Sequence, residues 1–256
     1  MRPKGRERKA RSTMRLDDWI DRRHLEPATQ ATYRAAIAAS PHSAIVIDNF
    51  LQSEKLDALQ RVFATEGRFE TRYYAWKPSE NPAEKSEIAV PADAWRAAPA
   101  SQRASIESVF AGAHPAYRLG HGIVSHLKFT ELLRSPEFMD FLRAVTGIRP
   151  ATLTGFVTRI MMGGQYIQPH SDFWRIRDLC GVYYASTGWQ SGFGGRFRHC
   201  APGPDLVPID PLPNRLLLFE PRVECKHDVE SIVEAGASWQ RWAFSLWFGT
   251  PAPPEP

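Results

Sequence analysis

A change in hydrophobic pattern near residue 150 constrains the fold more than any other feature of this 256-residue chain. From Ala151 onward, short apolar segments of five to eleven residues alternate with Gly and Pro. The segments read TLTGFVTRIMM, QPHSDFW, CGVYYAS, RFRHC, NRLLLFE, ESIVEA and RWAFSLWFG. Many short strands at this spacing are typical of a sandwich or a double-sheet jelly roll. We therefore expect a mainly β core over about 151–250.

The part of the chain before this core, 16–147, shows mainly helical periodicity. Apolar residues recur at three- and four-residue spacing near 16–39, 53–66, 101–112 and 130–147. One short strand, 43–50 (SAIVIDNF), interrupts this half and is expected to join the β core. Residues 76–101 are rich in Pro, Ala and Glu, which predicts an irregular excursion that could act as a lid.

A helix start near residue 135 is the most specific local signal in this half. Ser135 is a good N-cap, Pro136 suits the first turn, and Glu137 adds an acidic side chain near the helix N-terminus. The sequence therefore predicts a helix that begins after Ser135.

Positive charge is concentrated at the N-terminus. The formal net charge is +4, and residues 1–11 alone carry six Lys or Arg and one Glu. The rest of the chain is close to neutral and offers no basic face, so nucleic acid is not an expected partner. We expect 1–15 to be a disordered basic arm and 16–256 to form one domain.

Three cysteines, Cys180, Cys200 and Cys225, are far apart and form no CxxC pair. This argues against a disulfide framework or a four-thiolate zinc site and favours a reduced, cytoplasmic setting. No apolar run approaches the roughly 20 residues of a membrane helix, and no secretory h-region follows the basic start. A membrane is therefore not an expected partner, and the oligomeric state is left open.

The segment QPHSDFW contains two residues of metal-ligand type, His170 and Asp172. On a strand they would share one face, with Ser171 on the other. Two His and one carboxylate can bind Fe(II) and leave positions open for oxygen chemistry, so a third ligand is needed. His227, just past the strand NRLLLFE, is favoured by its longer spacing, and His199 is the alternative. Without a metal, these residues would be solvated polar pairs.

Arg241 opens the apolar strand RWAFSLWF, where Arg241, Ala243 and Ser245 share one face. An inward-pointing Arg needs an anionic partner, and a guanidinium binds a carboxylate in bidentate fashion. A carboxylate-binding Arg241 together with iron ligands predicts a site for a 2-oxo acid that chelates the metal. The alternative is that Arg241 caps a strand edge. Phe244, Leu246 and Phe248 are expected in the core.

The set of His170, Asp172, His227 and Arg241 resembles the HxD…H…R arrangement of Fe(II)/2-oxoglutarate-dependent dioxygenases, in the prolyl-4-hydroxylase-like branch. The flanking segments are similar too, over roughly 43–66 and 151–250. They are SAIVIDNFL, GGQYIQPHSDFW, VYYAS, FGGRF and NRLLLFEPRVECKHDV.

The resemblance implies a double-stranded β-helix (jelly roll, cupin-like) flanked by N-terminal helices, and an oxidoreductase with one catalytic domain. Fe(II) would be bound by the two His and the Asp named above, and the distal carboxylate of 2-oxoglutarate by Arg241 with Tyr184 and Ser245. O2 would be the second cosubstrate and ascorbate a supporting reductant, with release of succinate and CO2. Because the Asp of HxD is present, hydroxylation is favoured over halogenation.

Departures from the family pattern affect the substrate. Ala185-Ser186 replace a usual Leu-Asn, so Tyr183 is an alternative to Tyr184 as the cosubstrate contact. Met161-Met162 replace an Arg-Tyr pair, and Arg196 stands where an acidic residue is common. The leading hypothesis is therefore hydroxylation of a small molecule, such as an amino acid, a derived metabolite or a natural-product intermediate. The alternatives are a prolyl or peptidyl hydroxylase and a non-catalytic jelly-roll binding protein. The expected substrate contacts are Trp174, Arg175 and Gln168. Together with Arg177, Trp174 and Arg175 could clamp an anionic or amphipathic substrate, and ordinary loop packing and solvated charge are the alternative.

Overall fold

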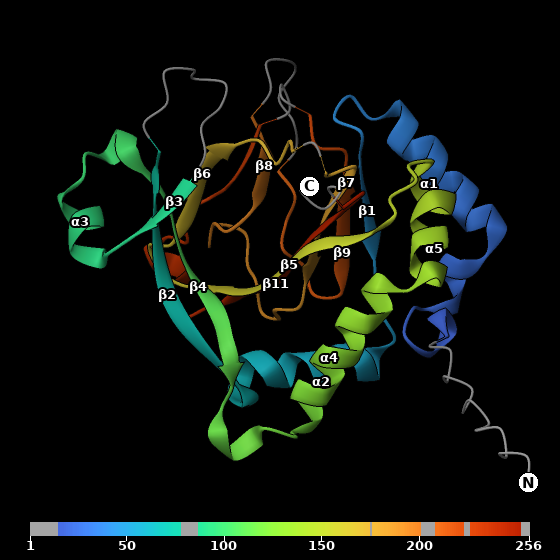
Figure 1. Ribbon diagram of the computed structural model, residues 1–256, viewed down its shortest axis with the longest axis horizontal. Coiled ribbons are helices and arrows are strands. Elements are labelled where there is room, and N and C mark those ends of the chain that lie inside the picture. The colour runs from blue at the N-terminus through green and yellow to red at the C-terminus, as the bar shows by residue number, and fades with distance from the viewer. Residues whose placement is uncertain (1–14, 78–86, 175, 201–207, 223–225, 252–256) are drawn as a thin grey trace, which may run out of the picture.

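The computed structural model describes residues 15–77, 87–174, 176–200, 208–222 and 226–251. One antiparallel sheet dominates these residues, and most of the helices lie on one side of it (Figure 1). The main path of the sheet runs β1-β9-β7-β11-β5-β4-β6-β10-β8, with β2 pairing β3 and β4 off this path. This is the expected architecture: a jelly-roll-like, strand-rich core with flanking helices.

The strands are β1 Ala44–Asp48, β2 Gly67–Trp76, β3 Glu87–Val90, β4 Arg103–Ala113, β5 Thr152–Met161, β6 Tyr166–His170, β7 Leu179–Tyr184, β8 Phe197–His199, β9 Arg215–Phe219, β10 His227–Val229 and β11 Arg241–Gly249. The helices are α1 Pro27–Ala39, α2 Ser53–Arg61, α3 Ala92–Ala97, α4 His121–Arg134 and α5 Pro136–Thr146. A π-helical turn over Val62–Glu66 continues α2, and the remaining helical turns are short 3₁₀ segments.

The sheet curls because β4 changes partners along its length. Near Ser108 and Val109 it pairs with β5, and near Ser105 and Ile106 it pairs with β6. Side chains from β5, β6, β7, β10 and β11 consequently line a single cavity. The fold thus surrounds an interior space with strands that lie far apart in the sequence.

The outer face of β11 forms the main core with the helices. Phe244 packs edge-on against Phe129 of α4, with ring centroids 5.4 Å apart, and Phe248 packs near Phe138 of α5. Leu246 is 1% exposed and belongs to the same cluster. The expected alternation of β11 is confirmed: Phe244, Leu246 and Phe248 face the helices, whereas Arg241, Ser245 and Trp247 line the cavity.

The start of α5 also agrees with the sequence. The hydroxyl of Ser135 accepts a hydrogen bond from the backbone N–H of Phe138 at 3.1 Å, and Pro136 is the first helical residue. Gly147 ends the helix with a positive φ of 81°, which an L side chain rarely adopts.

The prediction of a helical half over 16–147 is wrong in its middle. β2, β3 and β4 lie there, and the segment 101–112, expected as a helix, forms most of β4. Apolar positions in RASIESVFAGA fit either period, and pairing with β2, β5 and β6 selects the strand. Within the expected excursion 76–101, β3 and α3 are regular, whereas 78–86 lie outside the described residues.

Two further strand predictions need correction. The segment ESIVEA forms no strand, because β10 ends at Val229 and a 3₁₀ turn over Glu234–Gly236 follows. The strand expected over QPHSDFW ends at His170, so Asp172 lies in the following loop. Of the expected basic arm, residues 1–14 lie outside the described residues. No helix in the described ranges is long and apolar enough to span a membrane.

Candidate metal centre

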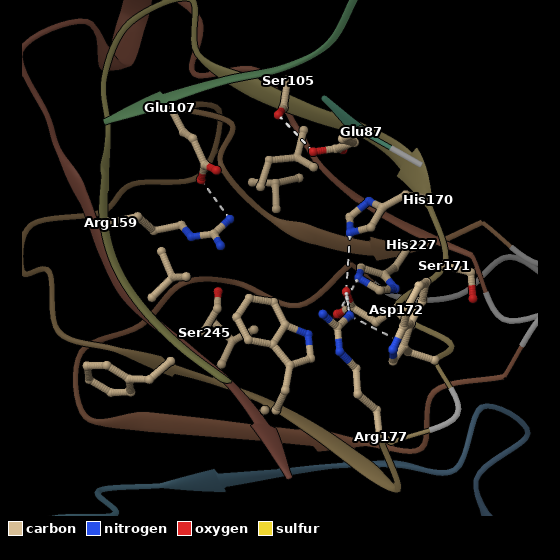
Figure 2. A pocket seen from close by; sticks show the side chains of 18 of the residues that line it. Glu87, Ser105, Glu107, Arg159, His170, Ser171, Asp172, Arg177, His227 and Ser245 are labelled. Atoms are coloured by element: carbon tan, nitrogen blue, oxygen red, sulfur yellow. Dashed lines mark hydrogen bonds and ion pairs between the residues drawn. The ribbon is translucent and has the colours of Figure 1, made fainter. Parts of the chain in front are cut away.

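Three polar residues converge where β6 and β10 pair. His227, the first residue of β10, lies directly opposite His170, the last residue of β6. Asp172 follows two positions later, and the turn of the chain brings its carboxylate back between the two imidazoles (Figure 2). The strand pairing therefore fixes both His residues, and the loop supplies the carboxylate.

The ligand-type atoms of His170, Asp172 and His227 all lie within 4.8 Å of one another. His170 Nε2 is 3.9 Å from Asp172 Oδ1, and His227 Nε2 is 3.5 Å from Asp172 Oδ2. Among the described residues this is the sole group of three His, Cys, Asp or Glu with such geometry. Two imidazole nitrogens and one carboxylate form a facial donor set that leaves positions open, which fits Fe(II) in oxygen chemistry.

Neighbouring groups fix the orientation of the imidazole rings. His170 Nδ1 lies 2.9 Å from the carbonyl oxygen of Gln168, which favours a proton on Nδ1 and leaves the Nε2 lone pair free for a metal. The His227 ring is stacked on Phe197, with centroids 4.8 Å apart, and meets Phe219 edge-on at 5.0 Å. Both rings are thus held in one orientation.

The charges of the site suit a cation. Burial raises the pKa of Asp172, but the hydrogen bond to His227 and the charges of His227, His170 and Arg177 together bring that pKa below its usual range. Burial, followed by the proximity of His227, lowers the pKa of His170. A carboxylate beside a neutral imidazole is the protonation state that metal binding requires.

Arg177 connects Asp172 to the cavity wall. Its Nη1 donates to the side-chain Oδ1 and to the main-chain oxygen of Asp172, both at 3.2 Å. Its guanidinium also lies 4.8 Å from the ring centre of Trp247, whose buried Nε1 has no hydrogen-bond partner among the described residues. The sequence indicates a substrate clamp or ordinary loop packing for Arg177, and it does not predict the pairing with Asp172.

His199, the alternative third ligand, does not join this group. It pairs with His227 in the β8–β10 ladder, but its ring stacks on His42 with centroids 4.6 Å apart. Burial, and then the proximity of His42, lowers the pKa of His199 to about 4. The structure therefore brings His227, and not His199, to His170 and Asp172.

Arg241 lines the same cavity and is buried, with 1% of its surface exposed. Its Nε donates to the carbonyl oxygen of Gly195 at 2.9 Å, and its Nη1 lies 3.6 Å from Met161 Sδ. The guanidinium lies 4.9 Å from the ring centre of Tyr184. Among the described residues it has no carboxylate within ion-pair distance, and burial lowers its pKa. A buried cation of this kind fits an anionic ligand.

The other expected cosubstrate residues lie on β11 and on its neighbour β7. Ser245 shares its face of β11 and lines the cavity. Tyr184 is fully buried, and its hydroxyl has no hydrogen-bond partner among the described residues. Unpaired polar atoms around a buried guanidinium would be satisfied by the oxygens of a carboxylate. The residues present thus fit 2-oxoglutarate.

The three expected substrate residues differ in where they lie relative to the cavity. Trp174 is 61% exposed at the mouth of the cavity, next to the exposed Phe173. Gln168 is not among the described residues that line the cavity, because the inward-facing residues of β6 are Ile167, Pro169 and His170. Arg175 lies outside the described residues.

The cavity extends beyond the triad to a group of charged residues that the sequence analysis missed. Its volume is about 1800 Å³. Glu107 of β4 and Arg159 of β5 form a buried ion pair at 2.7 Å, and Ser105 donates to Glu87 of β3 at 3.4 Å (Figure 2). These residues went undetected because 87 and 107 were expected in an excursion and a helix, where no inward face could be assigned.

A double-stranded β-helix that carries two His and one carboxylate in its interior defines the class of non-haem iron oxygenases. Residues 156–249 match the family model of the 2OG-Fe(II) oxygenase superfamily. This match places residues 156–249, which include the triad and Arg241, in that superfamily of oxidoreductases, whose metal and cosubstrate are Fe(II) and 2-oxoglutarate. Comparison with curated proteins finds no match.

Solved structures of prolyl hydroxylases share the fold. A prolyl-4-hydroxylase from Pseudomonas putida is 14% identical with a TM-score of 0.55, over 87% of this chain and 100% of that chain. A prolyl hydroxylase from Trichoplax adhaerens, in complex with a hypoxia inducible factor peptide fragment, is 17% identical with a TM-score of 0.56, over 89% of this chain and 92% of that chain. A 2OG-Fe(II) oxygenase family oxidoreductase from Burkholderia pseudomallei is 13% identical with a TM-score of 0.52, over 86% and 90%.

Proposed function

We propose that this 2OG-Fe(II) oxygenase hydroxylates a residue of a polypeptide. One observation carries the proposal: the cavity beside the triad has a volume of about 1800 Å³, above the roughly 300–1,000 Å³ of ordinary small-molecule pockets. Phe173 and Trp174 are exposed at its mouth and offer an apolar contact surface to a segment of chain. The likeness to prolyl hydroxylases, one of them bound to a peptide fragment, agrees with this proposal.

A small-molecule substrate, the leading hypothesis from the sequence, is the second candidate. The buried charges of Glu87, Glu107 and Arg159 favour it, because small polar ligands are oriented by a few charged groups in a cavity. The size and open mouth of the cavity support the polypeptide better.

The proposed roles follow the geometry of the cavity. Nε2 of His170, Nε2 of His227 and the carboxylate of Asp172 hold Fe(II). The Arg241 guanidinium binds the distal carboxylate of 2-oxoglutarate, and the hydroxyls of Tyr184 and Ser245 donate to it. We assign the activity to a single catalytic domain over 16–256.

Bound together, Fe(II) and 2-oxoglutarate supply an oxidative decarboxylation that releases CO2, leaves one oxygen atom of O2 in succinate and inserts the other into a substrate C–H bond. The chain orients the reactants and excludes water. Arg241, buried at one end of the cavity, fixes the cosubstrate, and Arg177 holds Asp172 in its ligand orientation. Trp247, beneath Arg177, offers a flat face and an indole N–H to the substrate.

Succinate formation tests the proposal. Purified protein with Fe(II), ascorbate and 2-oxoglutarate is incubated with a randomised peptide library or with a panel of free amino acids. The proposal predicts extra succinate with the library and peptides that gain one oxygen atom. If free amino acids increase succinate formation and the peptide library does not, a small-molecule substrate is supported instead. Absence of both iron binding and succinate formation would favour a non-catalytic jelly-roll binding protein.

A further inference from the structure

We propose that Glu87 recognises a positively charged group of the substrate, an ammonium or a guanidinium, inside the cavity. The inference rests on the proposed function and names the substrate class of the same site. It concerns the wall formed by β3, β4 and β5, away from the residues that hold iron and 2-oxoglutarate. Figure 2 shows this wall, with Glu87 between Ser105 and His170 and with Glu107 and Arg159 further from the triad.

Glu87 is an acidic group that lacks a cationic partner. Its Oε2 accepts one long hydrogen bond, 3.4 Å, from the Ser105 hydroxyl. Its Oε1 is buried and has no hydrogen-bond partner among the described residues. No Lys or Arg of the described ranges lies within ion-pair distance of it. Leaving a carboxylate buried in this state is costly, and the cost is relieved when a ligand supplies a cation.

The neighbouring ion pair does not meet this need. The Glu107 carboxylate and the Arg159 guanidinium bind each other at 2.7 Å, and both side chains are at least nine-tenths buried. Their charges therefore largely cancel. Arg159 nevertheless directs its guanidinium into the cavity, where its Nε has no hydrogen-bond partner in the described part of the chain. The wall thus has one balanced pair, one unbalanced carboxylate and a donor still available to a ligand.

Other cationic residues of the cavity do not cancel Glu87. Arg177 is paired with Asp172, and Arg241 donates to the Gly195 carbonyl and is the proposed partner of the cosubstrate carboxylate. Arg72 and Lys226 line the rim and are exposed, so solvent and salt screen their charges. Screening is much weaker for the buried oxygens of Glu87. A cation that enters the cavity therefore finds its strongest attraction at this carboxylate.

The location of Glu87 connects recognition to chemistry. Glu87 and His170, one of the metal-ligand residues, line the same cavity, and Figure 2 shows both side chains at its wall. A substrate that pairs its cation with Glu87 is held beside the triad, where its C–H bonds are within reach. The hydroxylated residue, or one adjacent to it, is therefore a Lys, an Arg or a residue with a free α-amino group.

Wild-type protein provides the first test. The peptides of a randomised library that gain one oxygen atom are sequenced, and we expect Lys or Arg at or next to the modified residue. For one such peptide, replacing Lys by norleucine or Arg by citrulline is expected to lower kcat/KM by about 10- to 100-fold. A second arm compares lysine, arginine and agmatine with norleucine and citrulline as free compounds, which separates a side-chain cation from a small free amine.

The variant Glu87→Gln removes the charge and keeps the shape. The preference for Lys over norleucine is expected to fall below about threefold. The matched control is Glu131→Gln, an exposed carboxylate on α4 that is not among the residues lining the cavity, which should retain the wild-type preference. If Glu87→Gln does not fold, as judged by circular dichroism, the comparison of cationic and neutral compounds with the wild-type protein decides alone.

The outcomes separate the two proposals. Hydroxylated peptides without enrichment of Lys or Arg, or an equal rate with norleucine, would overturn the role of Glu87 and leave the polypeptide hydroxylase intact. No hydroxylated peptide, together with a clear preference for cationic free compounds, would overturn the polypeptide reading and support Glu87. No turnover of any peptide or amine would overturn both.

Discussion

At the scale of single residues, the assignment of His227 as the third metal-binding residue can be tested against its alternative, His199. His227 and His199 are register partners on adjacent strands, so their substitution perturbs the same ladder. His227→Ala is expected to abolish stoichiometric iron binding, because two of three donors rarely hold the metal, whereas His199→Ala should retain it. Anaerobic titration with Fe(II) measures both, and the reverse result would reassign the ligand.

Arg241 gives a second prediction at this scale. Arg241→Ala is expected to raise the 2-oxoglutarate concentration needed for half-maximal turnover by roughly two orders of magnitude, because a buried carboxylate loses its charged partner. The concentration needed by Arg241→Lys should lie between those of the wild type and Arg241→Ala, since Lys keeps the charge without the bidentate geometry. An unchanged requirement in Arg241→Ala would remove this residue from the site.

The same residue has a consequence for stability. Arg241 is a buried guanidinium whose described contacts are a carbonyl oxygen, a thioether and an aromatic ring. 2-Oxoglutarate should therefore raise the Tm of the wild-type protein, and Arg241→Met should lose this shift while keeping a Tm at least as high without ligand. A ligand-induced shift that survives in Arg241→Met would contradict the assignment.

At the scale of elements, the contact between α4 and β5 predicts acid sensitivity. His126 of α4 is hydrogen-bonded to the Thr158 hydroxyl of β5 at 2.7 Å, and burial lowers its pKa to about 4. The unfolded chain binds a proton near pH 6.5 that the folded state excludes, so this contribution to stability is complete above pH 6.5 and is lost as the pH falls toward 4.

Urea unfolding between pH 7 and pH 4 measures this effect. The free energy of unfolding should fall by on the order of 1 kcal/mol per pH unit because of this one group. His126→Gln removes the titrating ring and should flatten that part of the profile. An equally steep profile in His126→Gln would show that the acid sensitivity has another origin.

The elements differ in how far the sequence predicted them. β11 was predicted with the right faces because its alternation is regular and its outer residues meet Phe129 and Phe138 of the helices. β4 was mistaken for a helix because its apolar spacing suits both periods and its partner β2 had not been recognised. Pairing with distant segments determines that this segment is a strand. The spacing of apolar residues in one sequence does not show which segments pair.

The candidate site shows the same division. The positions of His170, Asp172 and His227 relative to one another followed from motif and spacing. Glu87, Glu107 and Arg159 could not be predicted, because their meeting depends on the pairing of β4 with β5 and on the strand β3. Arg177 was visible as a residue, but its bond to Asp172 depends on the fold of the loop.

At the scale of the whole molecule, one curled sheet explains why residues from 72 to 251 line one cavity. Helices α4 and α5 support its outer face, and the inner face is left for metal, cosubstrate and substrate (Figure 1). The triad lies on β6, β10 and the loop after β6, near one end of the strand order, and Arg241 lies on β11, whereas the proposed substrate wall is formed by β3, β4 and β5. This separation lets one superfamily reaction serve a substrate class that the motif does not define.

The central claim is that His170, Asp172 and His227 form a working iron centre for 2-oxoglutarate turnover. The most direct test measures bound Fe(II) and succinate together, in wild type and in His227→Ala. The account predicts one iron per chain and O2-dependent conversion of 2-oxoglutarate to succinate in the wild-type protein, with both lost in the variant. Wild-type protein that binds no iron, or His227→Ala that still binds it and forms succinate, would contradict the account.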